Sequence, residues 1–294
     1  MKLKATPLVL LIAMSLIAAA CVPLPAGGPA PVAIAAGERT VDVGNGIVGV
    51  FNQPAGAAPV PAVLMLHGFG SSKDEVGNMY KNLAAALQER GVASLRIDFR
   101  GYGKSDGDTG ESSLDTMVAD AQTAYEYLKA QPSVDAARIG VLGFSLGGGV
   151  AIISAGQHPG WYKSMALWSS VGDPATDMVG SVGQEAFDTA AAKGVVGLDL
   201  GFRTIVLKKD FFDSLARYDL AALIRDYPGA LLAIAGDQDF SAAYVEGFVA
   251  AATGQPKEAW IIPGGDHIYG VLSEDQTMAD SVIEKTADWF AQTL

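Results

Sequence analysis

Short apolar runs alternate with longer amphipathic segments from about residue 39 to the end of the chain. The runs are bounded by turn residues, as buried strands are, and they cover residues 62–66, 94–98, 139–142, 164–168, 230–235 and 259–262. Helical patterns lie between most of them, for example over residues 113–129 and 277–292, and a hairpin is expected first, over residues 40–51. This alternation predicts an α/β fold with a mostly parallel, doubly wound sheet covered on both faces.

One interval, residues 172–218, interrupts the alternation. It is too long for a plain connection between a strand and a helix, and residues 195–207 make it too apolar for a solvated linker. We therefore predict a small inserted lid that separates two parts of the core, residues 38–171 and 219–294. Its large side chains, Phe202 and Phe211 among them, either cover a ligand pocket or complete the core, and the sequence leaves both possibilities open.

The first twenty residues have the pattern of an export signal. Lys2 and Lys4 precede an apolar run, residues 8–20, that ends in three alanines. The run is shorter than the ~20 residues that cross a bilayer as a helix. We expect residues 1–20 to form a cleaved signal peptide and the chain to be exported.

The only cysteine, Cys21, directly follows the predicted cleavage site and cannot form an internal disulfide. Its position resembles that of the acylated cysteine of bacterial lipoproteins, with Ala18 where Leu is usual. The resemblance implies that Cys21 carries a lipid at the cell surface or facing the periplasm, and that residues 21–37, rich in Pro, Ala and Gly, form a flexible tether. The alternative is an ordinarily secreted protein, and membrane fractionation of a Cys21→Ser variant distinguishes the two.

Composition and charge exclude several kinds of partner. Half of the residues are hydrophobic and 18% are charged, so the chain can bury a sizeable core. The net charge of −12 would repel nucleic acid and anionic lipid headgroups. We expect no nucleic-acid partner, and membrane contact only through Cys21. The three histidines and one cysteine have no metal-ligand spacing, so neither a metal nor an organic cofactor is expected.

Two segments, residues 103–107 and 143–147, match the G-x-S-x-G pattern of a serine nucleophile. In that pattern a strained turn between a strand and a helix lifts the serine hydroxyl, and the start of the helix directs N–H groups at the site. Ser145 directly follows a predicted strand and precedes an apolar segment that can start a buried helix, whereas Ser105 lies in a polar loop. We predict that Ser145 is the nucleophile and Ser105 a turn residue.

The general base should be a histidine, because its unperturbed pKa of about 6.5 allows it to accept and return a proton near neutral pH. His267 follows the last predicted strand and can reach back over the sheet edge to Ser145. His158 precedes a proline and follows the predicted helix that starts after Ser145, and a packing role is expected for it there. His67 begins a loop whose backbone supplies an oxyanion donor in this architecture, and its imidazole is expected to be structural.

The acid that orients the base should follow an earlier strand. Asp239 lies far enough beyond the strand at residues 230–235 to turn toward His267. Asp237 competes for the role, and Asp266 is disfavoured because an immediate neighbour rarely achieves the geometry needed at Nδ1. The order Ser145, Asp239, His267 is the order that α/β-hydrolases use.

From about residue 39 onward the chain resembles the α/β-hydrolase superfamily, on the strength of residues 67–70 (HGFG), 98–107 (DFRGYGKSDG) and 143–147 (GFSLG). These motifs are similar to its small-lid branch, which holds cinnamoyl and feruloyl esterases, other carboxylesterases and relatives of serine aminopeptidases. The resemblance implies the triad above and an oxyanion hole formed by the N–H groups of Phe69 and Leu146. It implies serine-based hydrolysis of a carboxylic ester through an acyl-enzyme, with a small-molecule ester as substrate.

Alternative activities remain at this point. The same triad could cleave amides or peptides, act as a thioesterase, or transfer the acyl group to an acceptor other than water. A non-catalytic binding lipoprotein on a retired hydrolase scaffold is a further possibility.

Overall fold

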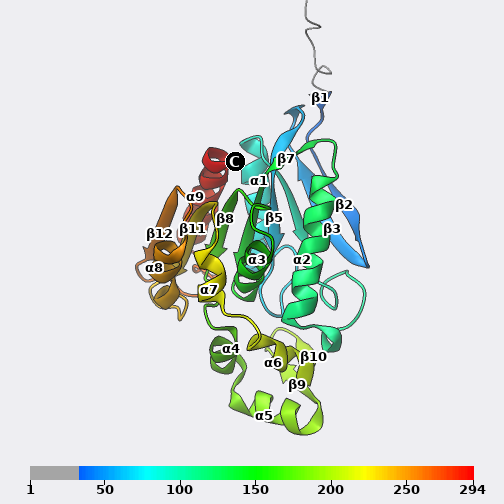
Figure 1. The fold of residues 1–294 in the computed structure, drawn as a ribbon, viewed down its shortest axis with the longest axis vertical. Coiled ribbons are helices and arrows are strands. Elements are labelled where there is room, and N and C mark those ends of the chain that lie inside the picture. The colour runs from blue at the N-terminus through cyan, green and yellow to red at the C-terminus, as the bar shows by residue number, and fades with distance from the viewer. Residues whose placement is uncertain (1–32) are drawn as a thin grey trace, which may run out of the picture. The chain divides into compact units, whose positions relative to one another are not determined.

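The computed structural model describes residues 33–294 (Figure 1). The predicted signal peptide and Cys21 lie outside the described residues. Within residues 33–294 the main sheet has eight strands in the order β12-β11-β8-β7-β5-β6-β3-β2. In chain order these strands are β2 (Gly37–Gly44), β3 (Ile47–Gln53), β5 (Val60–Leu66), β6 (Ala93–Ile97), β7 (Val134–Phe144), β8 (Ser164–Trp168), β11 (Ala230–Gly236) and β12 (Lys257–Ile262).

The sheet is parallel from β12 through to β6, and its other end is antiparallel. β3 runs antiparallel to both β6 and β2. The β2–β3 hairpin is the one predicted over residues 40–51, and its turn holds Asn45 at a φ of 55° between two glycines. The predicted fold class, a mostly parallel and doubly wound sheet, is confirmed.

Helices cover both faces of the sheet (Figure 1). One face carries α1 (Met79–Glu89) and α9 (Thr277–Thr293), which pack against each other. The other carries α2 (Leu114–Lys129), α3 (Leu146–Gln157), α7 (Leu220–Arg225) and α8 (Ala242–Ala251). Each face buries its own apolar cluster, and parallel strands buried on both sides are continuous apolar runs for this reason.

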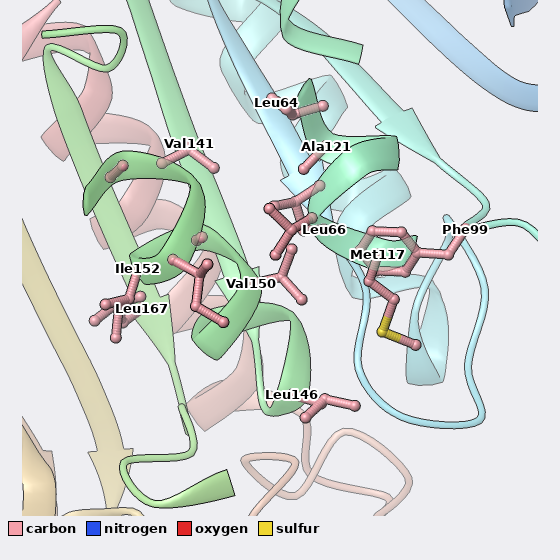
Figure 2. Close-up of a cluster of buried hydrophobic side chains, with 14 of the residues drawn as sticks. Leu64, Leu66, Phe99, Met117, Ala121, Val141, Leu146, Val150, Ile152 and Leu167 are labelled. Carbon is pink, nitrogen blue, oxygen red and sulfur yellow. The ribbon is translucent and has the colours of Figure 1, made fainter. Parts of the chain in front are cut away.

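Helix α3 is buried nearly all round because it lies between the sheet, α2 and α7. Figure 2 shows this part of the core, where Val150 of α3 and Met117 of α2 lie beside Leu66 of β5. The apolar segment after Ser145 therefore forms the buried helix that the sequence predicts. A rigid, buried α3 fixes the position of the residue at its start.

A second, small sheet pairs β1 (Ala33–Ile34) with β4 (Gly56–Ala57). The end of the predicted tether therefore differs from a flexible linker, since residues 33–34 are paired and Gly37 already belongs to β2. The apolar pair finds backbone partners in the connection between β3 and β5, which a compositional argument cannot foresee. Among the described residues, no helix is long and apolar enough to span a membrane.

Residues 172–218 form a separate group of elements between β8 and α7, gathered at one end of the molecule (Figure 1). They are α4 (Pro174–Val182), α5 (Gln184–Lys193), the antiparallel strands β9 (Val195–Asp199) and β10 (Thr204–Lys208), and α6 (Lys209–Leu215). Their apolar residues differ in burial. Ile205, Leu207 and Phe211 are buried, whereas Phe202 is 73% exposed. Part of this segment therefore completes the core, and part of it does not.

Candidate active site

Ser145 occupies the sharp turn between β7 and α3. Its backbone has a φ of 53° and a ψ of −120°, a conformation that costs a non-glycine residue about 1–3 kcal/mol. The flanking glycines are needed because a Cβ on Gly143 or Gly147 would come within 2.2 Å of a backbone oxygen. Backbone bonds hold the turn, from Ser145 N–H to Trp168 O at 2.9 Å and from Gly148 N–H to Ser145 O at 3.0 Å.

The three residues of the predicted triad lie within hydrogen-bond distance of one another. Ser145 Oγ is 3.1 Å from His267 Nε2, and His267 Nδ1 is 3.0 Å from Asp239 Oδ1. They come from three connections at the carboxyl ends of β7, β11 and β12, where parallel strands deliver side chains to one edge. The rings of Phe144 and Phe240 lie 5.1 and 5.4 Å from the His267 ring and restrict its orientation. The geometry permits proton transfer from Ser145 to His267.

Asp239 faces His267, whereas the two other candidates, Asp237 and Asp266, do not. Its side chain is 4% exposed, and Ser241 Oγ donates a hydrogen bond to Oδ2. Burial raises the pKa of this carboxyl, but the hydrogen bonds from His267 and Ser241 outweigh burial and bring the pKa below its ordinary value. The Asp237 carboxylate instead accepts the Gly264 N–H, and that of Asp266 accepts the N–H groups of two residues in its own turn.

The two predicted oxyanion donors belong to segments that meet at this serine, since Phe69 lines the same cavity as Ser145 and Leu146 is its chain neighbour. Leu146 is the first residue of α3, and Phe69 lies in the loop after β5. Among residues 33–294, neither N–H group has a hydrogen-bond acceptor. Both are therefore free to bind a developing oxyanion.

A cavity of about 640 Å³ opens beside Ser145 and His267. Its walls come from the loop after β5, the residue before Ser145, the tip of the β9–β10 hairpin and the loop before α9. They include Phe69, Gly70, Ser71, Ser72, Glu75, Val76, Phe144, Phe202, Arg203, Ile268 and Leu272. The volume suits a small organic ligand.

The family pattern described as serine aminopeptidase, S33, matches residues 57–230, more than half of the chain. The chain belongs to the serine aminopeptidase S33 family. An uncharacterized protein of Mycobacterium tuberculosis is 33% identical to it over 225 residues, which cover 76% of this chain and 68% of that protein. Esterase EstD of Thermotoga maritima is 33% identical over 114 residues, or 37% of this chain and 27% of that protein.

Solved structures give the same fold for this S33-family chain. Est1E of Butyrivibrio proteoclasticus, in a structure with ferulic acid bound, superposes with a TM-score of 0.69 at 20% identity over 87% of this chain and 98% of that one. The esterase domain of a Rhodothermus marinus protein has a TM-score of 0.63 at 26% identity over 88% and 99% of the two chains. The chain is thus a hydrolase with the α/β-hydrolase fold, in an esterase-like family.

Glu75 is a site residue of this S33-family chain that the sequence did not indicate. It lies at the cavity wall with a φ of 58°, which turns its side chain back beneath the loop that carries Phe69. Its carboxylate accepts hydrogen bonds from Gly68 N–H (2.5 Å), Ser71 Oγ (2.8 Å) and Val76 N–H (3.0 Å). Burial raises the pKa of Glu75, and these hydrogen bonds oppose the rise. These three donors suit the carboxylate form of Glu75, which can only accept hydrogen bonds.

The β9–β10 hairpin supplies a second unforeseen site residue, Arg203. Leu200 N–H donates to Arg203 O at 2.9 Å and closes the hairpin tip. The tip rests on Gly70, where a Cβ would come within 2.6 Å of Leu200, and Arg203 Nη1 donates to Gly70 O at 3.2 Å. Arg203 is the single cation of the mostly apolar stretch 195–207, and this was the available sequence signal.

The remaining histidines and the second G-x-S-x-G serine have structural contacts. His67 Nε2 accepts the Phe99 N–H at 3.1 Å, so its Nδ1 carries the proton and donates to Gly68 O at 2.8 Å. His158 stacks on Trp161 at 3.7 Å between ring centres. Ser105 Oγ donates to Asp98 O and accepts the Val48 N–H, which fits a turn residue.

Proposed function

We propose that this chain hydrolyses carboxylic esters of small molecules through an acyl-enzyme on Ser145. The observation that carries the proposal is the continuous relay from Ser145 Oγ through His267 to Asp239, at 3.1 and 3.0 Å. His267 Nε2 takes the Ser145 proton as Oγ bonds to the carbonyl carbon, and it then returns this proton to the departing alkoxide. Water attacks the acyl-enzyme in the same way, with His267 as its base.

The other groups act on the charges that develop. The N–H groups of Phe69 and Leu146 would hold the oxyanion, and each such donor is worth about 3 kcal/mol in the transition state. The Asp239 carboxylate, whose pKa is kept low by His267 and Ser241, would fix the imidazole tautomer and stabilise the imidazolium.

The cavity favours an ester over the amino terminus of a peptide. An aminopeptidase needs a free carboxylate or another acceptor for the α-ammonium group of its substrate. Among the described residues that line the cavity, Glu75 is the sole carboxylate, and three donors already occupy it. Arg203 would in addition repel an ammonium group. Two of the similar proteins are named as esterases.

A matched pair of serine variants tests the proposal. Ser145→Ala should abolish labelling by a fluorophosphonate probe and lower ester hydrolysis by several orders of magnitude, because no other group can form the acyl-enzyme. Ser105→Ala should keep most of both, with a loss of stability of about 1 kcal/mol per hydrogen bond removed. Circular dichroism establishes that each variant is folded. Labelling that survives in Ser145→Ala and disappears in Ser105→Ala would overturn the assignment.

A further inference from the structure

We propose that Arg203 forms an anion subsite in the cavity, and that the preferred substrates are esters that also carry a carboxylate, such as monoesters of dicarboxylic acids. The inference rests on the proposed esterase function and specifies its substrate class. It follows from the charge of the cavity wall, from the way in which Arg203 is held, and from its contact with Gly70, the residue next to Phe69.

The charge of the cavity wall favours an anionic ligand. Among the described residues that line it, Arg203 is the sole lysine or arginine. No carboxylate in residues 33–294 forms an ion pair with Arg203, although many other arginines of the chain are paired. The Glu75 carboxylate in the same wall is hydrogen-bonded to three donors of its own loop and forms no ion pair with Arg203 within residues 33–294. A bound carboxylate would therefore meet an uncompensated guanidinium.

Arg203 is also held in place before any ligand binds. Its Nη1 donates to Gly70 O at 3.2 Å, and its guanidinium carbon lies 5.7 Å from the centre of the Tyr102 ring. This is the one hydrogen bond that the Arg203 side chain makes within the described part of the chain. A guanidinium has five N–H donors in a planar fork, and that fork matches a carboxylate in two parallel bonds. The remaining donors are available to a ligand.

The position of Arg203 sets the length of the substrate. The Gly70 oxygen lies less than two residues along the chain from the Phe69 N–H, so the two are at most about 7 Å apart at about 3.8 Å per Cα step. A substrate whose carbonyl oxygen is bound at Phe69 could therefore place a carboxylate at Arg203 across a few methylene groups. The apolar side chains of Phe202 and Leu272, which are 73% and 70% exposed at the same cavity, would cover that methylene chain.

The net charge of −12 opposes an anionic substrate, but it acts at long range. At physiological ionic strength, charges farther than about 8 Å are largely screened. A direct bidentate contact with Arg203 is screened far less, so the local contact decides. We therefore expect the preference for an anionic ester to fall as salt rises and still to persist at 0.15 M.

The experiment compares monomethyl adipate with methyl hexanoate, which share the methyl ester and the chain length and differ in the terminal carboxylate. Hydrolysis is followed in a pH-stat for the wild type, Arg203→Met, Arg203→Lys and the control Arg225→Met. Arg225 is an exposed arginine outside the cavity wall, so its replacement changes the net charge equally. Arg203→Met should lower kcat/KM for monomethyl adipate at least tenfold more than for methyl hexanoate, mainly through KM. Arg203→Lys should recover part of the loss, and Arg225→Met should behave as the wild type.

A binding measurement separates the subsite from the chemistry. In the Ser145→Ala background, calorimetry with monomethyl adipate should show binding that weakens tenfold or more on adding Arg203→Met. If no ester is hydrolysed but this difference is found, the proposed function fails and the subsite stands. Equal losses on both esters, or equal binding with and without Arg203, would show that Arg203 only supports Gly70 and would overturn the subsite.

Discussion

At the scale of single residues, the loop that carries Phe69 depends on a carboxylate that does not react. Glu75 binds the N–H groups at both ends of this loop, on Gly68 and Val76, and also the hydroxyl of Ser71. The Phe69 N–H is thereby held in position without contact between Glu75 and the substrate carbonyl. In the proposed mechanism Glu75 would therefore be a positioning residue, which acts on the reaction through the backbone.

Glu75→Gln should lower kcat for all esters by about tenfold or more and leave KM nearly unchanged. An amide has one acceptor oxygen where the carboxylate has two, so one of the backbone N–H groups meets an NH₂ group and the loop moves. The full loss of one oxyanion donor, 100- to 1000-fold, sets roughly the upper limit. Steady-state kinetics on a small and a large ester, with inhibition by a trifluoromethyl ketone analogue of the transition state, provide the measurement.

The neighbouring Asp74→Asn is the matched control, because the Asp74 carboxylate contacts Arg96 at 2.7 Å and is absent from the cavity wall. It should leave kcat and the affinity for the ketone unchanged in the folded protein. If Glu75→Gln retains the wild-type kcat and ketone affinity, the positioning role is wrong.

Sequence reasoning identified some of these residues and missed others for a physical reason. The position of Ser145 in a strained turn could be predicted, because that turn depends on local features: small neighbouring residues, a preceding strand and a following helix. Glu75 could not, because its role depends on a φ of 58° that turns the side chain beneath Gly68. No pattern of residue types encodes that turn.

At the scale of elements, the β9–β10 hairpin and α6 have different relations to the cavity. Phe202 lies at the hairpin tip, is 73% exposed and lines the cavity. Phe211 of α6 is fully buried, and its ring lies 5.4 Å from that of Phe69. The two phenylalanines, which the sequence analysis treated alike, therefore have different roles.

Phe202→Ala should lower kcat/KM for bulky or aryl esters far more than for an acetate ester, with little change in the free energy of unfolding, because the side chain is already in water. Phe211→Ala should reduce the free energy of unfolding by about 3–5 kcal/mol and affect both esters alike. Urea denaturation and a two-ester kinetic comparison of each variant test this. Loss of selectivity in Phe211→Ala with wild-type selectivity in Phe202→Ala would reverse the assignment.

The strands of the main sheet were predictable because each is a short apolar run between turn residues, and the sheet buries both of its faces. The hairpin β9–β10 was not predicted as such. Its strands bury alternate residues such as Ile205 and Leu207, and the long apolar run around them hides that alternation. Which residues of a lid face a cavity depends on how it docks, and this is a tertiary property.

At the scale of the whole molecule, one buried histidine links stability to pH. Burial lowers the pKa of His67 to about 4, although the hydrogen bond to Gly68 opposes the decrease. In an unfolded chain the pKa of histidine is about 6.5. Between these two pH values the unfolded chain binds a proton that the folded chain does not. The stability that neutral His67 contributes is therefore complete above pH 6.5 and is lost as the pH falls toward 4.

We expect the free energy of unfolding to fall by roughly 1 kcal/mol per pH unit from this group between pH 6.5 and 5. His67→Gln keeps one donor and one acceptor for Gly68 and Phe99 and should lose this part of the slope. Urea denaturation of both proteins at several pH values measures the difference. Parallel pH profiles for the two proteins would contradict the contribution of His67.

Export of the chain and acylation of Cys21 stay predictions, since they concern residues before residue 33.

The contact between the hairpin tip and Gly70 has a consequence for protein engineering. Exchanging a surface loop between relatives in order to alter specificity assumes that the loop is independent of the chemistry. Here Leu200 lies so close to residue 70 that a side chain there would collide with it, and Arg203 bonds to the same residue. A transplanted hairpin would therefore pack differently against Gly70, the residue next to Phe69. Exchange should include residues 68–76 together with residues 195–208, so that the donor loop and the hairpin that rests on it come from one parent.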